Sequence, residues 1–514
     1  MAFAWMPTLS GRSLAALLAT ALLAGAGCKP DAQPSGPLRI ALYSDPLTLD
    51  PHRRNELLTF AVLRNLYEAL TEFDAGAKVG PGLAESWENP TDLRWVFRLR
   101  HGVRFHDGRE LTAEDVRFSF ERARTHPESN VGSYLVSIEK VQVVNRYTVE
   151  VTTTQPYPIL LNKLAFVLIV PAGSPDEIDA PVGTGPYRLE TYAPGKRLAL
   201  VAFPEYWGGA PTEPRVEFLP EPDLAARLEL LTSGRVDILQ EPGPENLERI
   251  RVAPGCRVLA QDSLGSIFVL LRSDRPPFSD PRVRQAIDLA LDRRALVEKV
   301  LHGEGTPLGQ MVSQNVFGYA SGLEPRQADL AEARRLLGAA GYPDGLDLEL
   351  NYRPGRSEEA SGVREQLAAA GVRVKLVEVP WAELFKRLLA GDVGFYLGGW
   401  FCLSADASDL FDAMAHTRDP LRGYGASNFN RYSNPELDRM IEESSRNLDL
   451  LDRRRSLESC QRLLMSDLNF IPLYSPSVIF GVRKDIEWNL RRDGLILVKS
   501  IRRLPAAGQG RAES

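Results

Sequence analysis

Side chains able to support catalysis or metal binding are present, but none stands in the pattern that such chemistry requires. His101 and His106 lie in HGVRFHDG without carboxylates or thiols at metal-ligand spacing. GTGP at residues 183–186 lacks the lysine and the following helix of a phosphate-binding loop. The chain has no G-x-S-x-G nucleophile elbow and no H-E-x-x-H pair. We therefore expect surface histidines, a structural glycine turn and binding without catalysis, with a glycan-cleaving carboxylate pair as the lower-ranked alternative.

Polar side chains suited to hold a ligand follow the first predicted strand. Tyr43 and Ser44 come at the end of LRIALYSD, and ligands of α/β proteins bind beyond the carboxyl ends of strands. Asn428, in GASNFNRYSN, carries an amide that both donates and accepts hydrogen bonds. Packing at a sheet edge is the alternative for Tyr43. These three residues are candidates for ligand binding.

Length and composition limit what can position these residues. The 514 residues exceed one ordinary core, so two or more lobes are expected. A hydrophobic content of 44% and a charged content of 25% are typical of soluble globular proteins. The net charge of −6 lacks the basic excess of a nucleic-acid-binding protein.

The N-terminal segment is separate from this body. Arg12 is followed by SLAALLATALLAGAG, an apolar run typical of signal peptides, and small residues lead to Cys28. This resembles the lipobox of bacterial lipoproteins, although Gly25 stands where an aliphatic residue is usual. A plain secretory signal and a membrane anchor are the alternatives, and the run is short for a span. We predict a signal peptide at 1–27, lipidation of Cys28 and a Pro-rich tether at 28–37.

Three further cysteines would then lie in an oxidising compartment. An odd number leaves at least one free thiol. Cys460 lies in a helical pattern, RRRSLESCQRLLM, and is expected to be a small buried side chain. Cys256 with Cys402 is the candidate disulfide.

Hydrophobic periodicity predicts an α/β fold. LRWVFRLR, residues 93–100, alternates as a half-buried strand. A turn, a short strand at Val103 and Phe105, and a helix with Thr112 as its N-cap are expected next. Further along, a helix that ends at Gly341, the strand LDLELNY, a helix stopped by Gly371 and another strand indicate a sheet covered by helices.

The stretch DPRVRQAIDLALDRRALVEKVL, residues 280–301, carries one apolar stripe with a repeat of three and four residues. It predicts a single helix that starts at Ser279 or Asp280, next to Pro281.

The order of the motifs resembles the extracytoplasmic solute-binding proteins of ABC importers, family 5, which bind peptides and oligopeptides. The family's LA-x-SW, F-x-L-R-x-G-V-x-F-H-D-G and T-A-x-D-V-x-F-S patterns correspond to residues 83–87, 97–108 and 112–119. Similar stretches cover nearly the whole mature chain: LTLDPH (47–52), PVGTGPYRLETY (181–192), PEYWGGAP (204–211), GRVDIL (234–239), PPFSDPRVRQAIDLALDRRALVEKVLHGEGTP (276–307), LAEARRLLGAAGYPDG (330–345), YSNPELDRMI (432–441) and DLNFIPLY (467–474).

This resemblance implies a type II-like periplasmic binding fold of the large peptide-binding class, with a ligand cleft between two lobes. It implies lobe one at 38–267 plus 478–514 and lobe two at 268–477. The chain is expected to cross between the lobes within 264–274 and 474–482. Closure is then a hinge motion, which a ligand that touches both lobes stabilises through its higher affinity for the closed form.

In this family the segment after a strand that ends in Gly-Trp faces the cleft. Here it is FYLGGWFCLSADASDLFDAM, in which Trp400 would stack on the ligand. Asp406 or Asp409 would pair with the α-ammonium group of a peptide. The commoner spacing is W-x-x-D, whereas Asp406 stands six residues after Trp400. Capping of the helix ASDLFDAMA is the alternative for both aspartates.

Arg353, in NYRPGRSEEA, precedes a proline, as in some dipeptide-binding relatives whose arginine holds the peptide carboxylate. The planar guanidinium suits that role because it bonds a carboxylate twice. A solvated loop arginine is the alternative.

We therefore predict a lipid-anchored protein of the periplasm or cell surface that captures short peptides and delivers them to an ABC permease in the cytoplasmic membrane. We expect a monomer without cofactor, metal or nucleic acid. A non-peptide cargo such as an oligosaccharide or a nickel chelate is the alternative, followed by a hydrolytic enzyme or a signalling receptor on the same fold.

Overall fold

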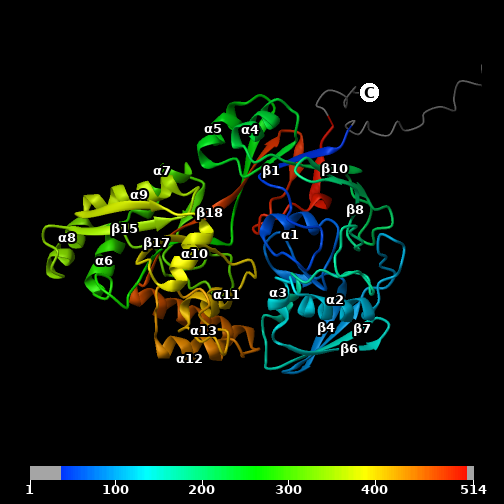
Figure 1. Ribbon diagram of the computed structural model, residues 1–514, viewed down its shortest axis with the longest axis horizontal. Coiled ribbons are helices and arrows are strands. Elements are labelled where there is room, and N and C mark those ends of the chain that lie inside the picture. Colours follow the sequence, from blue (N-terminus) through cyan, green and yellow to red (C-terminus); the bar gives the residue numbers. More distant parts are fainter. Residues whose placement is uncertain (1–35, 506–514) are drawn as a thin grey trace, which may run out of the picture.

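The computed structural model describes residues 36–505 and shows two lobes side by side (Figure 1). The predicted signal peptide, Cys28 and nearly all of the tether lie outside the described residues, so the signal peptide, the lipidation and the tether stay predictions. Within the described range, no helix has the length and apolar character needed to cross a membrane.

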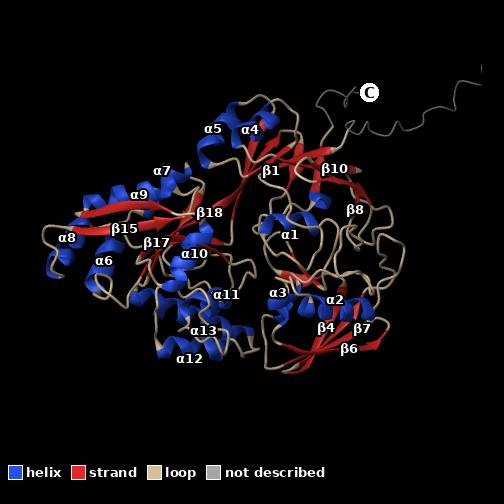
Figure 2. Ribbon diagram, viewed as in Figure 1, coloured by secondary structure: helices blue, strands red, loops and turns tan. Residues whose placement is uncertain are grey.

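One 12-stranded mixed sheet runs through both lobes (Figure 2). Its order is β16 (Val372–Glu378), β15 (Leu346–Tyr352), β17 (Phe395–Phe401), β13 (Gly265–Leu271), β18 (Phe470–Arg483), β11 (Ile238–Gln240), β1 (Leu38–Leu42), β10 (Arg215–Pro220), β9 (Arg197–Ala202) and β8 (Tyr187–Ala193). Beside this path, β12 (Cys256–Asp262) and β14 (Gly305–Pro307) also pair with β18. Parallel pairs link β1 with β10 and β11, and β15 with β16 and β17.

Strand β18 is the element that both lobes share. Its residues 470–476 pair with β13 and β14, and its residues 477–483 pair with β12. The chain also passes from β12 to β13 between Asp262 and Gly265. We propose these two places as the crossings, near the limits predicted from the sequence.

Helices cover the sheet of lobe two. They are α6 (Pro281–Leu289), α7 (Arg293–Leu301), α8 (Leu330–Ala339), α9 (Ser357–Ala369) and α10 (Trp381–Ala390). The predicted single helix at 280–301 is wrong, because α6 and α7 are separated by a break. Asp292 explains the break, since its carboxylate accepts a hydrogen bond from the backbone N–H of Ala295 at 3.0 Å and caps a new helix. Asp280 caps α6 in the same way, as predicted.

Lobe one contains a second sheet, with the order β4 (Ala84–Thr91), β5 (Arg94–Leu99), β7 (Thr148–Thr153) and β6 (Ile138–Asn145). Helix α2 (Ala113–Thr125) packs on β6 and β7. Thr112 caps it as predicted, and its backbone N–H donates to the Asp115 carboxylate at 2.8 Å. The predicted strand at Val103 and Phe105 is wrong: only an isolated bridge forms, because two glycine turns crowd this stretch.

The GTGP turn has the structural role expected of it. A side chain at Gly183 would collide with the backbone of Leu66. His106, expected on the surface, is instead half-buried against this turn, where Nε2 lies 3.1 Å from the Gly185 carbonyl oxygen. Burial lowers the pKa of His106 to about 4, so the ring is neutral at physiological pH.

The remaining helices and strands complete the two lobes. The helices are α1 (Leu57–Leu63), α3 (Leu160–Leu164), α4 (Leu224–Thr232), α5 (Leu247–Val252), α11 (Ser408–Leu410), α12 (Pro435–Ser444) and α13 (Leu450–Asp467), with the short turns η1 (Gly132–Leu135), η2 (Pro244–Asn246), η3 (Phe411–Ala415) and η4 (Val498–Ser500). The short strand pairs are β2 (Thr71–Phe73) with β3 (Val79–Pro81), and β19 (Ile486–Trp488) with β20 (Ile501–Arg503).

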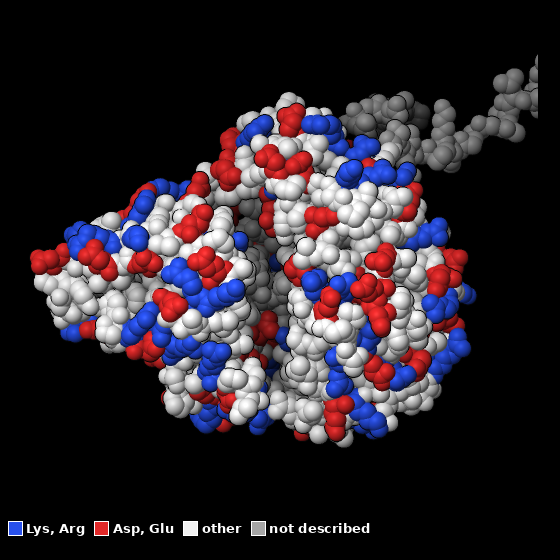
Figure 3. All heavy atoms as spheres, viewed as in Figure 1, with Lys and Arg blue, Asp and Glu red and all other residues white. Residues whose placement is uncertain are grey.

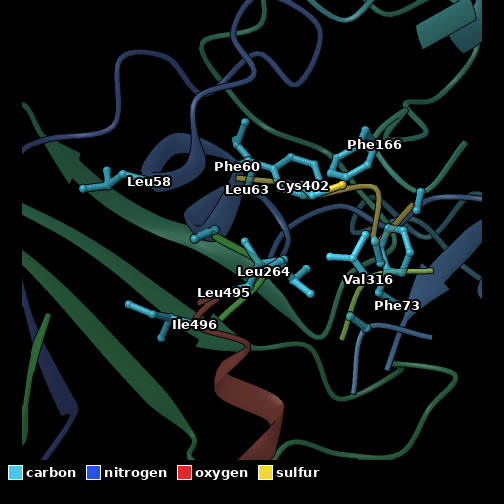
Figure 4. Close-up of a cluster of buried hydrophobic side chains, with 14 of the residues drawn as sticks. Leu58, Phe60, Leu63, Phe73, Phe166, Leu264, Val316, Cys402, Leu495 and Ile496 are labelled. Atoms are coloured by element: carbon cyan, nitrogen blue, oxygen red, sulfur yellow. The ribbon is translucent and has the colours of Figure 1, made fainter. Parts of the chain in front are cut away.

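The two lobes meet in an apolar cluster (Figure 4). Phe60 and Phe166 of lobe one pack together with Val316 and Cys402 of lobe two. A hollow runs between the lobes on the face shown in Figure 3. The lobes are therefore apposed without merging into one body.

The candidate disulfide is wrong. Cys256, Cys402 and Cys460 are all free and buried. Cys256 lies in a small core with Leu228 and Ile250, whereas Cys402 lies in the cluster between the lobes, so the two thiols cannot meet. Cys460 is buried in a helix as predicted.

Candidate ligand site between the lobes

A cavity of about 410 Å³ lies between the lobes, within the range of about 300–1,000 Å³ that is usual for small-molecule sites. Lobe one contributes Leu57, Gln240, Glu241, Val478, Ile479, Phe480, Arg492, Asp493 and Gly494, lobe two contributes Ile267, Arg353, Arg356, Glu359, Phe401 and Leu403, and Pro476 and Ser477 lie at the second crossing. A solute in this cavity would touch both lobes.

Two arginines of lobe two reach the cavity from the turn between β15 and α9. Arg356 is neutralised by Glu359 at 2.8 Å, and Glu359 also accepts a hydrogen bond from the Tyr474 hydroxyl at 2.9 Å. Arg353 has no such partner among residues 36–505, and its side chain is exposed to the cavity. The cavity walls shield Arg353 from bulk water, and this desolvation, together with the neighbouring Arg356, lowers the pKa of Arg353. The guanidinium of Arg353 is therefore available to an anion.

Tyr43 lies in the same electrostatic environment as Arg353, although it is not among the residues that line the cavity. Burial, together with Glu241 and Glu56, raises the pKa of Tyr43 to about 12, and Arg353 opposes the shift. Ser44 does not line the cavity, and its hydroxyl donates to the Asp45 carbonyl oxygen at 3.3 Å. Of these two candidates, the structure brings only Tyr43 toward Arg353.

The segment after β17 approaches the cavity, but through residues other than those predicted. Phe401 and Leu403 line it, whereas Trp400 packs half-buried against the core between the lobes. The Trp400 indole Nε1 is buried and has no hydrogen-bond partner in the described part of the chain. Leu403 occupies the third position after Trp400, so the W-x-x-D spacing is filled here by an apolar side chain.

Asp406 is not at the cavity, which corrects the expectation that it meets a peptide ammonium group. Its carboxylate is 4% exposed and accepts two bonds from Arg453, at 2.6 and 2.7 Å. The Ser408 hydroxyl adds a third bond at 2.8 Å. Because both oxygens are engaged inside lobe two, we expect Asp406 to hold the fold.

Asp409 and Asn428 are also placed away from the cavity lining. Asp409 pairs with Lys163 of lobe one, which makes it a contact between the lobes. Asn428 is 3% exposed, and its amide bonds the carbonyl oxygens of His416 and Tyr432 and the Tyr432 N–H. The Asn428 amide thus makes its hydrogen bonds to the backbone of a loop of lobe two.

Gln240 and Glu241 line the cavity from lobe one at the end of β11, and neither was predicted from the sequence. The signal was present, because the strand-end argument that selected Tyr43 applies equally to the strand that contains GRVDIL. No metal site competes for this region: residues 36–505 contain no cluster of His, Cys, Asp and Glu arranged to hold a metal ion.

Comparison with known proteins identifies the family to which this chain belongs. The family model described as bacterial extracellular solute-binding proteins, family 5 Middle, matches residues 78–420. The chain belongs to this family. It is thus a solute-binding protein of the class that serves ABC importers, as the order of motifs predicted.

Individual relatives of this family 5 protein agree in fold and extent. It is 28% identical over 454 residues to heme-binding protein A of Haemophilus influenzae, which covers 80% of this chain and 81% of that one. It is 27% identical over 462 residues to the dipeptide-binding protein of Escherichia coli, with 82% and 86% covered. The solved structure of HbpA2 from Haemophilus parasuis superposes with a TM-score of 0.80 at 26% identity, with 91% and 100% covered. The predicted α/β periplasmic binding fold is confirmed.

Proposed function

We propose that this protein captures short peptides between its lobes and delivers them to an ABC permease. One observation carries the proposal: Arg353 presents an unpaired guanidinium to a cavity of about 410 Å³. Such a group binds a carboxylate through two parallel hydrogen bonds, and every linear peptide with a free C-terminus carries one. The similarity to a protein named for dipeptide binding supports the same cargo.

The remainder of the proposal concerns anchoring and motion. We propose that Cys28 carries a lipid and that residues 28–37 tether the body outside the cytoplasmic membrane. We also propose that the lobes move about the crossings at 262–265 and 476–477. A peptide that contacts lobe two through Arg353 and lobe one across the cavity would stabilise the closed arrangement.

Native mass spectrometry of the protein purified without denaturation from an exporting bacterial host tests the cargo. We expect extra mass that dissociates as short peptides. An Arg353→Gln variant purified in parallel should retain less of it. A sugar, a porphyrin or a metal chelate in place of peptides would contradict the peptide assignment and leave the importer class intact.

A further inference from the structure

Glu241 carries a second unpaired charge on the same cavity, opposite in sign to Arg353. Its side chain is exposed and lines the cavity from lobe one. No hydrogen bond or ion pair engages its carboxylate within the described chain. The nearby Arg227 guanidinium instead donates hydrogen bonds to the backbone carbonyl oxygens of Glu221 and Pro222, at 2.8 and 3.0 Å.

The backbone at Glu241 explains why two successive residues line one cavity. Neighbouring residues of a strand point to opposite faces. Glu241 departs from the strand with a φ of 50°, in the left-handed region that non-glycine residues seldom occupy. Such a conformation is unfavourable for a non-glycine residue and persists where the surroundings or a function require it.

Gln240 supplies an independent sign of a ligand. Its side chain is 4% exposed and lines the cavity, yet its Oε1 atom accepts no hydrogen bond from residues 36–505. A buried carbonyl oxygen without a donor is costly, and because this one lies at the cavity, it is open to a donor group of a ligand. Both Gln240 and Glu241 offer acceptors, and an ammonium group is a donor that can bond several acceptors at once.

The other charged residues of the cavity are already paired. Arg356 has Glu359 at 2.8 Å, and Asp493 has Arg491. Arg492 lies 3.7 Å from Asp262. Glu241 and Arg353 are the two cavity charges without a partner among the described residues, and they approach from different lobes.

We infer that Glu241 and Gln240 bind the ammonium group of a short zwitterionic solute whose carboxylate binds Arg353. This inference rests on the proposed capture of peptides and adds to it the residue that recognises the amino end. The two ends of the solute would then lie on different lobes. A peptide with both termini free joins the lobes, whereas a peptide blocked at either end contacts one lobe less strongly.

Calorimetric titration with two matched peptide pools tests this assignment. One pool holds Ala-Ala, Ala-Leu, Ala-Phe and Ala-Glu, and the other holds the same dipeptides with acetylated amino groups. Wild-type protein should bind the free pool roughly tenfold or more tightly than the acetylated pool. In Glu241→Gln this preference should shrink to within about threefold, because the free pool loses its charge partner while the acetylated pool has none to lose.

Glu248→Gln is the matched control, because it removes an exposed carboxylate from the next helix, away from the cavity, and should keep the preference. Equal binding of both pools to the wild type, or an unchanged preference in Glu241→Gln, would overturn the role of Glu241 and leave peptide capture standing. If neither pool binds the wild type, peptide capture itself fails, and the assignment fails with it. Circular dichroism of each variant confirms the fold.

Discussion

Lys163 of lobe one reaches Asp409 of lobe two, with 2.5 Å between Nζ and Oδ1, although the residues are 246 positions apart. Lys163 belongs to α3 and Asp409 to α11, which lie next to each other across the seam between the lobes (Figure 1). A second polar contact accompanies the pair, because the Asn162 amide donates to the Ser404 carbonyl oxygen at 2.7 Å. These contacts link the two lobes outside the lining of the cavity.

Replacing Lys163 by Met should shift the free protein toward an open arrangement. The change removes the ion pair and leaves the Asp409 carboxylate, 24% exposed, without its partner in the closed form. Small-angle X-ray scattering of the peptide-free variant should give a larger radius of gyration than the wild type. Lys140→Met, at an exposed position of lobe one, should leave the scattering unchanged. Identical curves for all three proteins would show that the pair does not govern closure.

Asp412 should make stability depend on pH. Burial and the neighbouring Asp409 raise the pKa of Asp412 to about 7, while Lys163 and a hydrogen bond from Ser445 oppose the shift. In the unfolded state this carboxyl has its ordinary pKa of 3.8, so between pH 3.8 and pH 7 the folded state binds more protons than the unfolded state. This group's contribution to the free energy of unfolding therefore falls as pH rises through that window, and it is constant above it.

The melting temperature of the wild type should accordingly drop between pH 5 and pH 8 by more than that of Asp412→Asn, which cannot titrate there. Asp344→Asn, an exposed position, serves as the control and should follow the wild type. Parallel pH profiles for wild type and Asp412→Asn would contradict the raised pKa.

Local patterns predicted the family and most of the element types, and they selected one residue, Arg353, that lines the cavity. The motif order and the helix ends near Gly341 and Gly371 depend on residues that are adjacent in the sequence, so they can be predicted without the tertiary structure. Arg353 follows a predictable strand and does line the cavity. Its role there stays a proposal.

Residues whose surroundings come from distant parts of the chain were placed poorly. Asp406 is engaged by Arg453, which is 47 positions away on α13. The residues next to Asp406 in the sequence do not indicate that pairing. Likewise, the residues next to Cys256 and Cys402 do not indicate that the two thiols pack in different cores. The position of Glu241 after a strand could have been used, but the left-handed backbone that brings its side chain to the cavity beside Gln240 is not predictable from a glutamate.

Asp406→Ala should lower the free energy of unfolding and leave the affinity for peptides nearly unchanged. Removing one partner of a buried, doubly bonded pair leaves Arg453 as an uncompensated charge and costs about 3–5 kcal/mol. Urea unfolding should show this loss, while dipeptide affinity under strongly native conditions stays near that of the wild type. Asp452→Ala breaks an exposed pair with Arg455, whose side chains are 63% and 76% exposed, and should cost less than about 1 kcal/mol. Normal stability combined with lost peptide binding in Asp406→Ala would restore the sequence-based role.

We propose that Arg353 binds the carboxylate of a peptide held between the lobes. Calorimetric titration of wild type and Arg353→Gln with the four alanyl dipeptides, as free acids and as C-terminal amides, tests it directly. We predict that Arg353→Gln weakens binding of the free acids by roughly 30-fold or more, as expected for loss of a desolvated charge partner, and changes binding of the amides little. Equal affinity of wild type and variant for the free acids, with both proteins folded, would contradict the claim.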